Sequence, residues 1–336
     1  MKNETIILGH GSGGKLSHDL IDNYFLPYLK NSILESLDDS AVFDLNDSLL
    51  AFTTDSYVVE PIFFPGGDIG KLAVCGTVND LCMSGAEPLY LSCGFIIEEG
   101  FSFDDLEKIV ISMKQSADDA GVKVIAGDTK VVAKRSADKL FINTSGIGLI
   151  RKDYKISGSS AVVGDKVILS GYIGDHGIAV MSERHGLSFE TKIKSDCAPL
   201  NNIIKNILDE GLGVHVLRDP TRGGLAAVLN EIAGQSGVTV FVNEDKIPVR
   251  EEVMGACEIM GLDPLYIANE GKFVAFAAPE DADKTLDIIR SCKYGESAQI
   301  IGEVKEKSKG KVILKTGIGG ERIVDMPSGL LLPRIC

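Results

Sequence analysis

The sequence contains no apolar run that approaches the roughly 20 residues needed to cross a membrane, so we expect no membrane span. A signal-peptide pattern is also missing, because Met1 to Glu4 lead directly into a short apolar segment that reads as a strand. The sequence shows no repeat of fixed period and no low-complexity segment. We therefore expect a cytoplasmic globular protein.

Basic residues are few compared with acidic ones. The chain has 34 Lys and Arg against 48 Asp and Glu, which gives a formal net charge of −14. This balance argues against nucleic acid or an anionic membrane as the main partner. An acidic enzyme that binds a triphosphate must neutralise that anion locally, and Mg²⁺ held by carboxylates is the simplest way to do so.

Paired cysteines and paired histidines are also lacking. No two of the seven cysteines form a C-x-x-C motif, and several lie in apolar segments, so we expect reduced core thiols. No two of the five histidines have the spacing of a zinc site. His176, in G-D-H-G, is expected to begin a helix and to be satisfied by solvent. Cys336 stands apart as the last residue of the sequence.

The length of 336 residues favours two domains with an α/β alternation of helices and strands. A polar, Gly/Ser-rich stretch over 151–164 marks the boundary between them. We therefore expect an amino-terminal domain over 1–155, a carboxyl-terminal domain over 156–322 and a tail over 323–336. The tail contains two prolines and a glycine and cannot form a regular helix.

Hydrophobic periodicity and capping residues predict the individual elements. In the first domain we expect helices over 15–29, from Asp68 as cap to about Ser84, and over 103–120 between Ser102 and Gly121. Strands are expected there over 49–54, 122–126 and 140–150. The second domain should contain a strand over 166–170, helices after Gly177 and over 201–208 and 223–233, and an edge strand or hairpin over 304–316.

The stretch G-H-G-S-G-G-K, Gly9 to Lys15, has the G-x-x-x-x-G-K spacing of a nucleotide-binding P-loop. In a P-loop the next residue is Ser or Thr, which places a hydroxyl on Mg²⁺, but here it is Leu16. The residues alone leave two interpretations open. The chain is a P-loop enzyme with one part missing, or it holds ATP in another way.

Acidic residues recur beside Gly, Ser or Thr at the ends of apolar runs: Asp38, Asp39, Asp55, Asp80, Asp128 and Asp219. If they converge, they offer the hard oxygen ligands that Mg²⁺ prefers, although each one alone is more often a turn or a helix cap. Asp80 lies in an otherwise apolar helix, where an unpartnered carboxylate is costly. Glu270, between apolar stretches, is as readily a turn carboxylate as a functional one.

Taken together, these segments resemble the HypE family of hydrogenase maturation proteins. The family belongs to the superfamily of aminoimidazole ribonucleotide synthetase, selenophosphate synthetase and thiamine-monophosphate kinase. The resemblance covers nearly the whole chain. The superfamily motifs are DDSA (38–41), TTD (53–55), the acid of NDL (79–81) and GDT (127–129). The stretch PIFFPGG (61–67) and the terminal PRIC (333–336) are specific to the HypE family.

The resemblance implies a mixed α/β, two-domain PurM-like fold. The strands of the amino-terminal domain would form a β-barrel with the partner chain of a homodimer, and ATP would bind in the cleft beside the barrel. The glycine-rich segment would be a mobile loop over the nucleotide and not a P-loop. Gly11, Gly13 and Gly14 would let backbone N–H groups approach phosphate oxygens, and Lys15 would add charge.

The resemblance also implies an activity. HypF uses carbamoyl phosphate to place a carbamoyl group on the terminal thiol, here Cys336, and ATP then drives its dehydration to a thiocyanate. The cyano group passes to iron on a HypC–HypD complex. Such a thiol belongs on a flexible end of the chain, and Arg334 would dock that end or neutralise the terminal carboxylate.

The site residues follow from the same resemblance. Lys130 and Glu270 match positions for phosphate handling and proton removal, and the base is undecided between them. Asn230 is expected to contact nucleotide or Mg²⁺. Asp38 is a sixth candidate beside the carboxylates that match the Mg²⁺–ATP ligands of the superfamily: Asp39, Asp55, Asp80, Asp128 and Asp219.

Two alternatives remain open from the sequence. Another enzyme of the superfamily, acting on a free small molecule, would share the carboxylates but have no use for Cys336. A thiol scaffold that carries cyanide made elsewhere would need Cys336, but its chemistry would not depend on Asp80.

Overall fold

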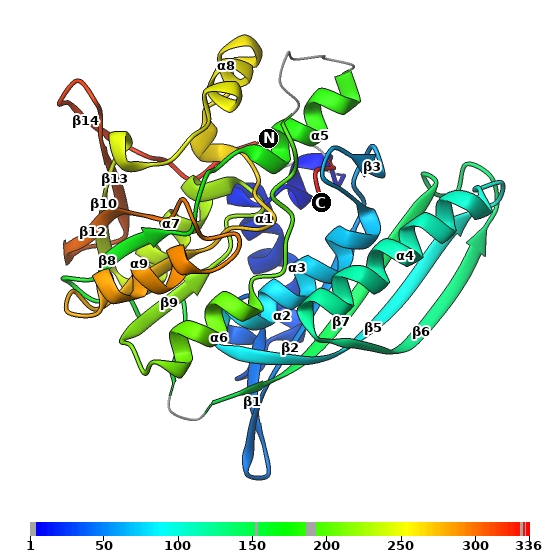
Figure 1. Cartoon of the computed structure of the whole chain (residues 1–336), viewed down its shortest axis with the longest axis horizontal. Helices are drawn as coiled ribbons and strands as arrows, with labels where there is room; N and C mark the ends of the chain where they lie inside the picture. Colours follow the sequence, from blue (N-terminus) through cyan, green and yellow to red (C-terminus); the bar gives the residue numbers. More distant parts are fainter. Residues whose placement is uncertain (1–4, 152–153, 186–192, 330–331, 333) are drawn as a thin grey trace.

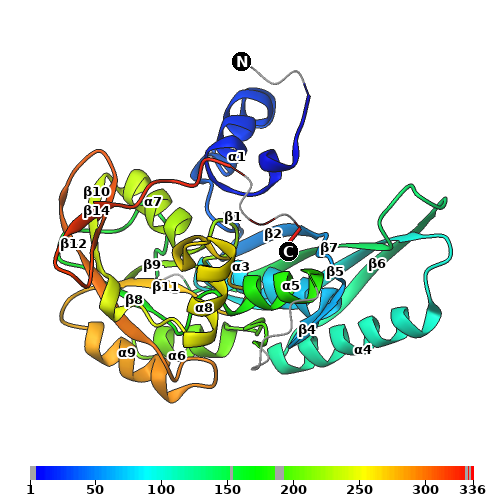
Figure 2. The ribbon, with the colours of Figure 1, turned by 90° about the horizontal axis from the view of Figure 1, so that it is seen from above.

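The computed structural model describes residues 5–151, 154–185, 193–329, 332 and 334–336. Within these residues the chain forms two α/β halves, each built on one large sheet (Figure 1). The halves lie side by side, and the helical amino-terminal segment stands out from them (Figure 2). None of the helices in the described part is long and apolar enough to span a membrane.

The first half is built on a sheet with the strand order β1-β2-β7-β5-β6, in which only β5 and β6 run parallel. Helix α3 packs on β2, β5 and β7, and α4 lies beside it. A short hairpin of β3 and β4 precedes α3. The bounds are β1 (Ala41–Leu45), β2 (Ser48–Tyr57), β3 (Phe63–Phe64), β4 (Gly67–Asp68), α3 (Ile69–Met83), β5 (Ala86–Glu98), α4 (Phe103–Ala120), β6 (Lys123–Val132) and β7 (Leu140–Ile150).

The two helices of this half begin and end where their capping residues predict. Asp68 Oδ1 accepts hydrogen bonds from the backbone N–H groups of Gly70 at 2.7 Å and Lys71 at 3.1 Å. The Ser102 hydroxyl accepts from the N–H of Asp105 at 3.3 Å. Gly121 ends α4 with a φ of 71°, which a residue with a side chain rarely adopts.

The second half contains a mixed sheet with the order β14-β13-β10-β12-β8-β11-β9. Its elements include the short 3₁₀ turns η4 (Glu244–Lys246) and η5 (Pro264–Tyr266). The strands are β8 (Lys166–Leu169), β9 (Val214–Arg218), β10 (Val238–Asn243), β11 (Val274–Ala277), β12 (Gln299–Lys307), β13 (Lys311–Lys315) and β14 (Glu321–Ile323). The helices are α5 (Asp175–His185), α6 (Asn201–Asp209), α7 (Gly224–Ser236), α8 (Glu251–Met260) and α9 (Ala282–Ser291).

The predicted edge strand or hairpin over 304–316 is wrong. The segment does form two strands, β12 and β13, but β10 lies between them. β12 pairs with β10 antiparallel and β13 pairs with it parallel, so the two consecutive strands never touch as a hairpin. β14 takes the sheet edge beyond β13.

Helix α3 lies between the two halves, and this position explains its apolar sequence. Besides the first sheet, it contacts β9 and α6 of the second half. It is buried along nearly its whole length, which is why its sequence is apolar on every face. Its buried polar residue Asn79 donates to the carbonyls of Ala198 and Glu270 and accepts from the N–H of Leu200. The two halves therefore share one core element.

The amino-terminal segment differs in detail from the sequence prediction. The expected strand after Glu4 is absent, since Leu8–Gly11 form a 3₁₀ turn, η1, and Ile6 and Leu8 are exposed. The predicted helix over 15–29 is helical throughout but is divided into three pieces and is followed by a 3₁₀ turn. The three pieces are α1 (Gly14–Leu20), the π-helix η2 (Ile21–Phe25) and α2 (Leu26–Leu29), and the 3₁₀ turn is η3 (Leu34–Ser36). The described tail residues after 323 form neither helix nor strand, as predicted.

Candidate active site

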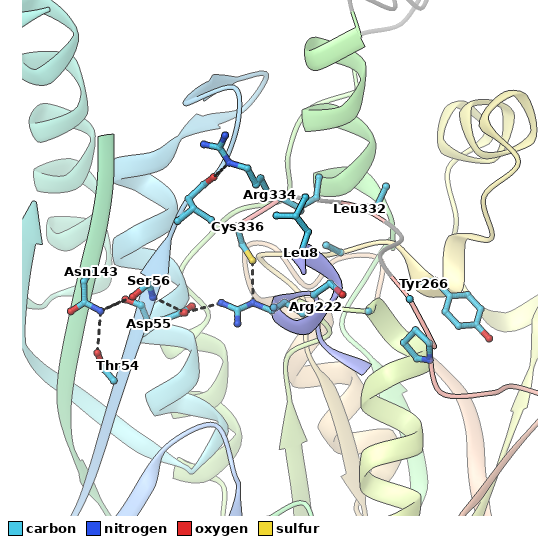
Figure 3. Close-up of a pocket in the computed structure, with 18 residues that line it drawn as sticks. Leu8, Thr54, Asp55, Ser56, Asn143, Arg222, Tyr266, Leu332, Arg334 and Cys336 are labelled. Carbon is cyan, nitrogen blue, oxygen red and sulfur yellow. Dashed lines mark hydrogen bonds and ion pairs between the residues drawn. The ribbon is translucent and has the colours of Figure 1, made fainter. Parts of the chain in front are cut away.

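The last residues of the chain lie in a cleft beside the end of β2. The backbone N–H of Val58 donates to the carbonyl oxygen of Cys336, and the N–H of Glu60 donates to that of Arg334, both at 3.1 Å. The Arg334 Nε donates to the Val58 carbonyl at 2.9 Å (Figure 3). Its guanidinium also contacts Asp138. Of the two roles expected for Arg334, the structure therefore shows docking of the tail.

The thiol of Cys336 faces an arginine. The Arg222 Nε donates to the sulfur at 3.4 Å, and Nη2 of the same guanidinium donates to Asp55 Oδ1 at 2.9 Å (Figure 3). Burial, the largest effect, raises the pKa of the thiol to about 11; Glu270 and Asp55 add to the rise and Arg222 opposes it. The thiol is therefore protonated at neutral pH while it occupies this position.

Cys336 borders two cavities. One, of about 460 Å³, is lined by residues from the amino-terminal segment, the β2 end and the tail, among them Gly11, Asp55, Asn143 and Arg222. The other, of about 540 Å³, contains most of the predicted carboxylates. The acidic residues that line it are Asp38, Asp39, Asp55, Asp80, Asp219, Glu231 and Glu270.

Three aspartates of the second cavity have raised pKa values with one shared cause. Burial is the largest effect on Asp39, Asp80 and Asp219, and charge repulsion from nearby carboxylates adds to it. The pKa of Asp219 rises to about 6, although Arg218 opposes the shift. Thr53 Oγ1 donates to Asp80 Oδ2 at 2.9 Å. The cavity thus gathers more negative charge than its own cations offset.

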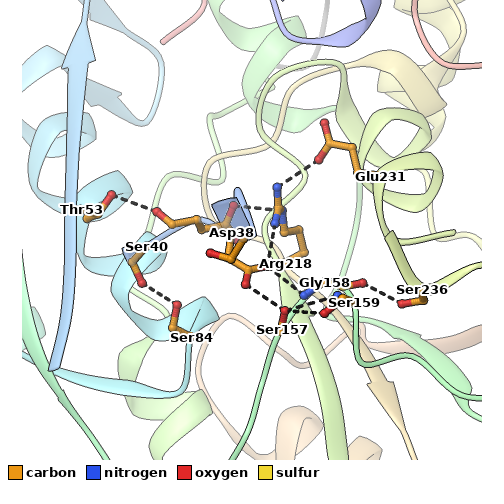
Figure 4. A network of polar contacts seen from close by, with 12 residues as sticks. Asp38, Ser40, Thr53, Ser84, Ser157, Gly158, Ser159, Arg218, Glu231 and Ser236 are labelled. Atoms are coloured by element: carbon orange, nitrogen blue, oxygen red, sulfur yellow. Dashed lines mark hydrogen bonds and ion pairs between the residues drawn. The ribbon is translucent and has the colours of Figure 1, made fainter. Parts of the chain in front are cut away.

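Arg218, at the end of β9, organises the acidic residues on one side of this cavity. Its guanidinium lies 3.0 Å from Asp39 and 3.2 Å from Glu231, and 3.7 Å from Asp38 (Figure 4). Asp38 also contacts the segment 151–164 that joins the two halves. The Ser157 hydroxyl and the Gly158 N–H donate to its carboxylate at 2.9 and 3.0 Å. Both Asp38 and Asp39 line the cavity, and Asp38 also has a structural role at the junction of the two halves.

Glu270 is the most isolated acid of the group. Its side chain is buried, and among the described residues its Oε1 has no hydrogen-bond partner. Burial raises its pKa well above the usual value, and repulsion from Asp219, Asp55 and Asp196 adds to the rise. A buried carboxylate oxygen without a partner is costly, so this position is better explained by a site for a ligand than by a turn.

Several predicted site residues lie elsewhere. Asp128 and Lys130 are exposed on the edge strand β6 and pair with each other at 2.7 Å. Asn230 donates to the carbonyls of Ala226 and Val324, so it fastens α7 to the start of the tail. Within one chain, these three side chains do not join the other candidates in the described cavities.

The glycine-rich segment packs on the tail. The N–H of Lys15 donates to the Pro327 carbonyl at 3.0 Å, and a Cβ on Gly14, whose φ is 72°, would lie 2.3 Å from that oxygen. A Cβ on Gly13 would lie 2.9 Å from the Cβ of Arg222. Gly11 and Gly13 border the carboxylate cavity, while Lys15 is exposed. No described strand leads into the segment, which excludes the P-loop interpretation.

Sequence reasoning missed four residues of the site. Arg218, Arg222 and Glu231 lie in or just after the stretch L-R-D-P-T-R-G-G-L, where only Asp219 was singled out. His176 was expected to be satisfied by solvent, and this is wrong. It is buried, and its ring nitrogens contact Ser195 Oγ at 2.8 Å and the Ile335 carbonyl at 2.9 Å. The local sequence around His176 carries no signal of these long-range partners.

The cavity suits a divalent cation chemically. No three described His, Cys, Asp or Glu side chains converge as a ready-made metal centre. Nevertheless, seven acidic residues line the cavity with only two arginines, Arg218 and Arg222, and Oε1 of Glu270 has no partner among the described residues. Carboxylates of this kind, completed by phosphate oxygens, are the normal ligands of Mg²⁺.

Comparison with known families agrees with this architecture. Residues 37–150 match the N-terminal domain of the AIR synthase related proteins, and residues 162–315 match their C-terminal domain. These matches define a two-domain protein of the PurM-like class and confirm the predicted mixed α/β fold.

Individual relatives identify the family of this chain within the PurM-like class. The chain is 49% identical to the carbamoyl dehydratase HypE of Bradyrhizobium diazoefficiens, over 100% of this chain and 97% of that protein. A HypE in a HypE–HypF complex superposes with a TM-score of 0.88 at 52% identity, over 92% of this chain and 99% of that one. A HypE in complex with ATP gives a TM-score of 0.84 at 50% identity, over 99% and 100% of the two chains. The chain belongs to the HypE family of carbamoyl dehydratases.

Proposed function

We propose that this chain dehydrates an S-carbamoyl group on its own Cys336 to S-cyanocysteine at the expense of ATP. The product supplies cyanide ligands for the iron centre of a nickel–iron hydrogenase. The observation that carries the proposal is the position of the Cys336 thiol, which borders the carboxylate cavity and lies beside Arg222. Family membership and the ATP-bound relative support the same conclusion.

The chemistry balances as an ATP-driven loss of water. The carbonyl oxygen of the S-carbamoyl group attacks the γ-phosphorus of ATP, and ADP leaves. The nitrogen then gives up its two protons, the C–O bond breaks, and inorganic phosphate departs with the former amide oxygen. The product is a thiocyanate, in which the carbon bonded to sulfur is joined to nitrogen by a triple bond. Phosphorylation is needed because the oxygen of an amide is a poor leaving group.

The side chains around Cys336 suit these steps. Arg222 reaches the sulfur and carries the positive charge that can stabilise an oxygen anion or phosphate formed there. Glu270 lines the same cavity as the thiol, and its raised pKa makes it a stronger base than an ordinary carboxylate. Lys130 lies on β6, away from this cavity of its own chain. These positions favour Glu270 as the base.

The carboxylate cavity is the proposed ATP site. Asp39, Asp55, Asp80 and Asp219 line it and would hold Mg²⁺. Mg²⁺ held by these residues would supply positive charge for the phosphate groups of ATP and for the cavity, which would stabilise the ionised form of these carboxylates. Arg218 fixes Asp39 and Glu231 in place for this role.

A homodimer would complete the site. The face of the first sheet that α3 and α4 leave uncovered exposes a set of large apolar side chains: Phe52, Tyr90, Ile96 and Leu149. An exposed apolar sheet face of this extent marks an interaction surface. Pairing of two such sheets would form the predicted intersubunit barrel and bring Asp128 and Lys130 on β6 toward the partner's cavity.

The proposed cycle also requires movement of the tail. The thiol must receive the carbamoyl group from HypF, enter the cleft for dehydration and deliver cyanide to a HypC–HypD complex. We propose that the domains extend over 1–155 and 156–322 and that the tail over 323–336 moves relative to them from about Pro327 onward, because Ile323 belongs to β14 and the buried Val324 is held by Asn230. The proposal extends to this chain the HypF partnership of the HypE–HypF relative, in the cytoplasm.

Intact-mass spectrometry tests the function. The chain is incubated with HypF, carbamoyl phosphate and ATP, and the terminal peptide is mapped. We expect an adduct of one carbamoyl group on Cys336 that loses one water only when ATP is hydrolysed. Glu270→Gln should accept the carbamoyl group and keep it, whereas Asp80→Asn should fold and dimerise but consume no ATP.

The alternatives give different results. An enzyme that acts on a free small molecule keeps its ATP turnover in Cys336→Ala, whereas the proposed dehydratase loses dehydration completely. A cyanide-carrying scaffold is indifferent to Asp80→Asn. If Glu270→Gln dehydrates its adduct normally while Lys130→Met does not, the base is Lys130.

A further inference from the structure

The end of the tail is held by hydrogen bonds to its main chain as well as by contacts of its side chains. His176 Nε2 lies 2.9 Å from the carbonyl oxygen of Ile335. Arg184 Nη2 donates to the carbonyl of Arg334 at 2.8 Å, next to the N–H of Glu60. The side chain of Ile335 is itself buried. These contacts fix the residue immediately before Cys336.

His176 is buried in the first turn of α5, and its hydrogen bonds define its tautomer. A carbonyl oxygen only accepts, so Nε2 must carry the proton that is donated to Ile335. Nδ1 then accepts from the Ser195 hydroxyl at 2.8 Å, while Ser195 Oγ accepts from the N–H of Cys197 at 3.1 Å. The chain of hydrogen bonds runs from the Cys197 backbone through Ser195 and His176 to the tail.

The hairpin formed by the P-I-F-F-P-G-G stretch (61–67) packs against His176 and Ser195. The Phe64 ring meets the imidazole edge-on, with ring centroids 5.4 Å apart. The carbonyl of Pro65 accepts from the N–H of Ser195 at 2.7 Å. Gly66 has a φ of 94°, and a Cβ there would lie 2.8 Å from the Ser195 nitrogen. The P-I-F-F-P-G-G stretch lies outside the lining of the carboxylate cavity and packs against His176, which contacts the tail, and against Ser195, its hydrogen-bond partner.

We propose that His176, supported by Ser195 and Phe64, is a positioning residue that latches the tail in the cleft through the Ile335 carbonyl. The latch sets the Cys336 sulfur at Arg222, on the border of the cavity that contains Glu270. Its contact is with a main-chain oxygen one residue before the thiol, so the thiol and its adduct stay free to react. The catalytic part of this inference rests on the proposed function, but the latch itself does not.

The latch has opposite consequences for the two half-reactions. HypF needs the thiol outside the cleft, whereas dehydration needs it inside. A weakened latch should therefore slow dehydration and leave carbamoylation by HypF as fast as before or faster. A variant that is merely misfolded slows both steps, so the split between them distinguishes a positioning role from a general structural one.

Thiol accessibility tests the latch without any catalytic step. All seven cysteines are described, and only Cys292 and Cys336 are partly exposed while the other five are buried. Cys292 therefore serves as an internal reference for alkylation of the intact chain by iodoacetamide. His176→Ala should raise the alkylation rate of Cys336 relative to Cys292 by roughly tenfold, the effect of losing one buried hydrogen bond. His176→Gln, which keeps a donor, should restore most of the protection.

The second measurement follows the two half-reactions by mass spectrometry in the presence of HypF, carbamoyl phosphate and ATP. In His176→Ala, dehydration of the carbamoyl adduct should fall by roughly tenfold and carbamoylation should not fall. If the wild-type chain never carries the adduct, the proposed function fails, and the alkylation result still decides the latch. Equal alkylation rates in wild type and His176→Ala would overturn the proposal.

Folding is controlled independently. Circular dichroism and thermal unfolding report whether His176→Ala retains the native fold. If it does not, Ser195→Ala carries the test, because it leaves the imidazole in place and removes the hydroxyl that orients it. This variant should show the same direction of change in both measurements, and unchanged protection and unchanged dehydration in it would refute the latch.

Discussion

The sulfur of Cys336 and the Nε of Arg222 are direct neighbours, 3.4 Å apart, although 114 residues separate them in the chain. The same guanidinium also binds Asp55 in the rim of the carboxylate cavity. Arg222 thus connects the thiol that carries the substrate with the side chains proposed to hold the nucleotide. Its position makes it the first residue to test.

Replacing Arg222 should impair dehydration without affecting carbamoylation. Arg222→Ala removes the charge beside the sulfur, and we expect the single-turnover rate of thiocyanate formation to fall by about a hundredfold, as for loss of an oxyanion donor. Arg222→Lys should retain part of the rate because it keeps the charge but loses the planar fork. Time-resolved mass spectrometry of the terminal peptide measures both steps. A wild-type rate in Arg222→Ala would remove it from the mechanism.

The docked thiol should titrate well above an ordinary cysteine. Burial raises its pKa to about 11 from an ordinary value of 9.0, so docking favours the protonated thiol. The resulting stabilisation of the docked tail is fully present below about pH 9 and is lost as the pH rises toward 11. The thiolate absorbance of wild type minus Cys336→Ser should show the high midpoint. A synthetic peptide of residues 326–336 is the control, and equal midpoints would contradict the buried position.

Asp219 should destabilise the ligand-free protein increasingly as the pH rises. Burial raises its pKa from 3.8 to about 6, so its contribution to stability is complete below pH 3.8 and is lost as the pH rises through 6. Asp219→Asn stays neutral, and its unfolding free energy should exceed that of wild type by an amount that grows between about pH 4 and 7, to on the order of 3 kcal/mol. Urea unfolding at several pH values measures this difference, and a pH-independent gap would refute the assignment.

The uncovered sheet face should control the oligomeric state. Ile96 on β5 is 44% exposed on this face, and Ile96→Lys would place a charge in the proposed barrel. We expect this variant to run as a monomer in size-exclusion chromatography with light scattering and to lose ATP turnover. Ile318→Lys is the matched control, because Ile318 is 98% exposed in the turn between β13 and β14. A dimeric, active Ile96→Lys would exclude this face.

Local signals in the sequence predicted local structure well. Asp68, Ser102 and Gly121 act through backbone groups within a few residues, so their caps can be predicted without knowledge of the fold. The otherwise apolar helix predicted around Asp80 likewise forms, as α3, and is buried along nearly its whole length. By contrast, β12 and β13 looked like a hairpin because the insertion of β10 between them depends on pairing across the whole domain.

The candidate site could be predicted only in part for the same reason. Asp39, Asp55, Asp80, Asp219 and Glu270 were named from their motifs, and all line the one cavity. Their cations, Arg218 and Arg222, were overlooked because their partners Asp39 and Asp55 lie far away in the chain. His176 was misjudged because its partners Ser195 and Ile335 are 19 and 159 residues away.

The sharing of α3 by both halves has a mechanical consequence. A helix that packs in the first sheet and against β9 and α6 leaves no hinge on which the two domains can close over a nucleotide. Access to the cavity must then be controlled by the ends of the chain, and these ends touch each other at Lys15 and Pro327. Withdrawal of the tail therefore removes a contact that supports the glycine-rich segment. The movement that takes the thiol out of the cleft thus also opens the cavity at the glycine-rich segment.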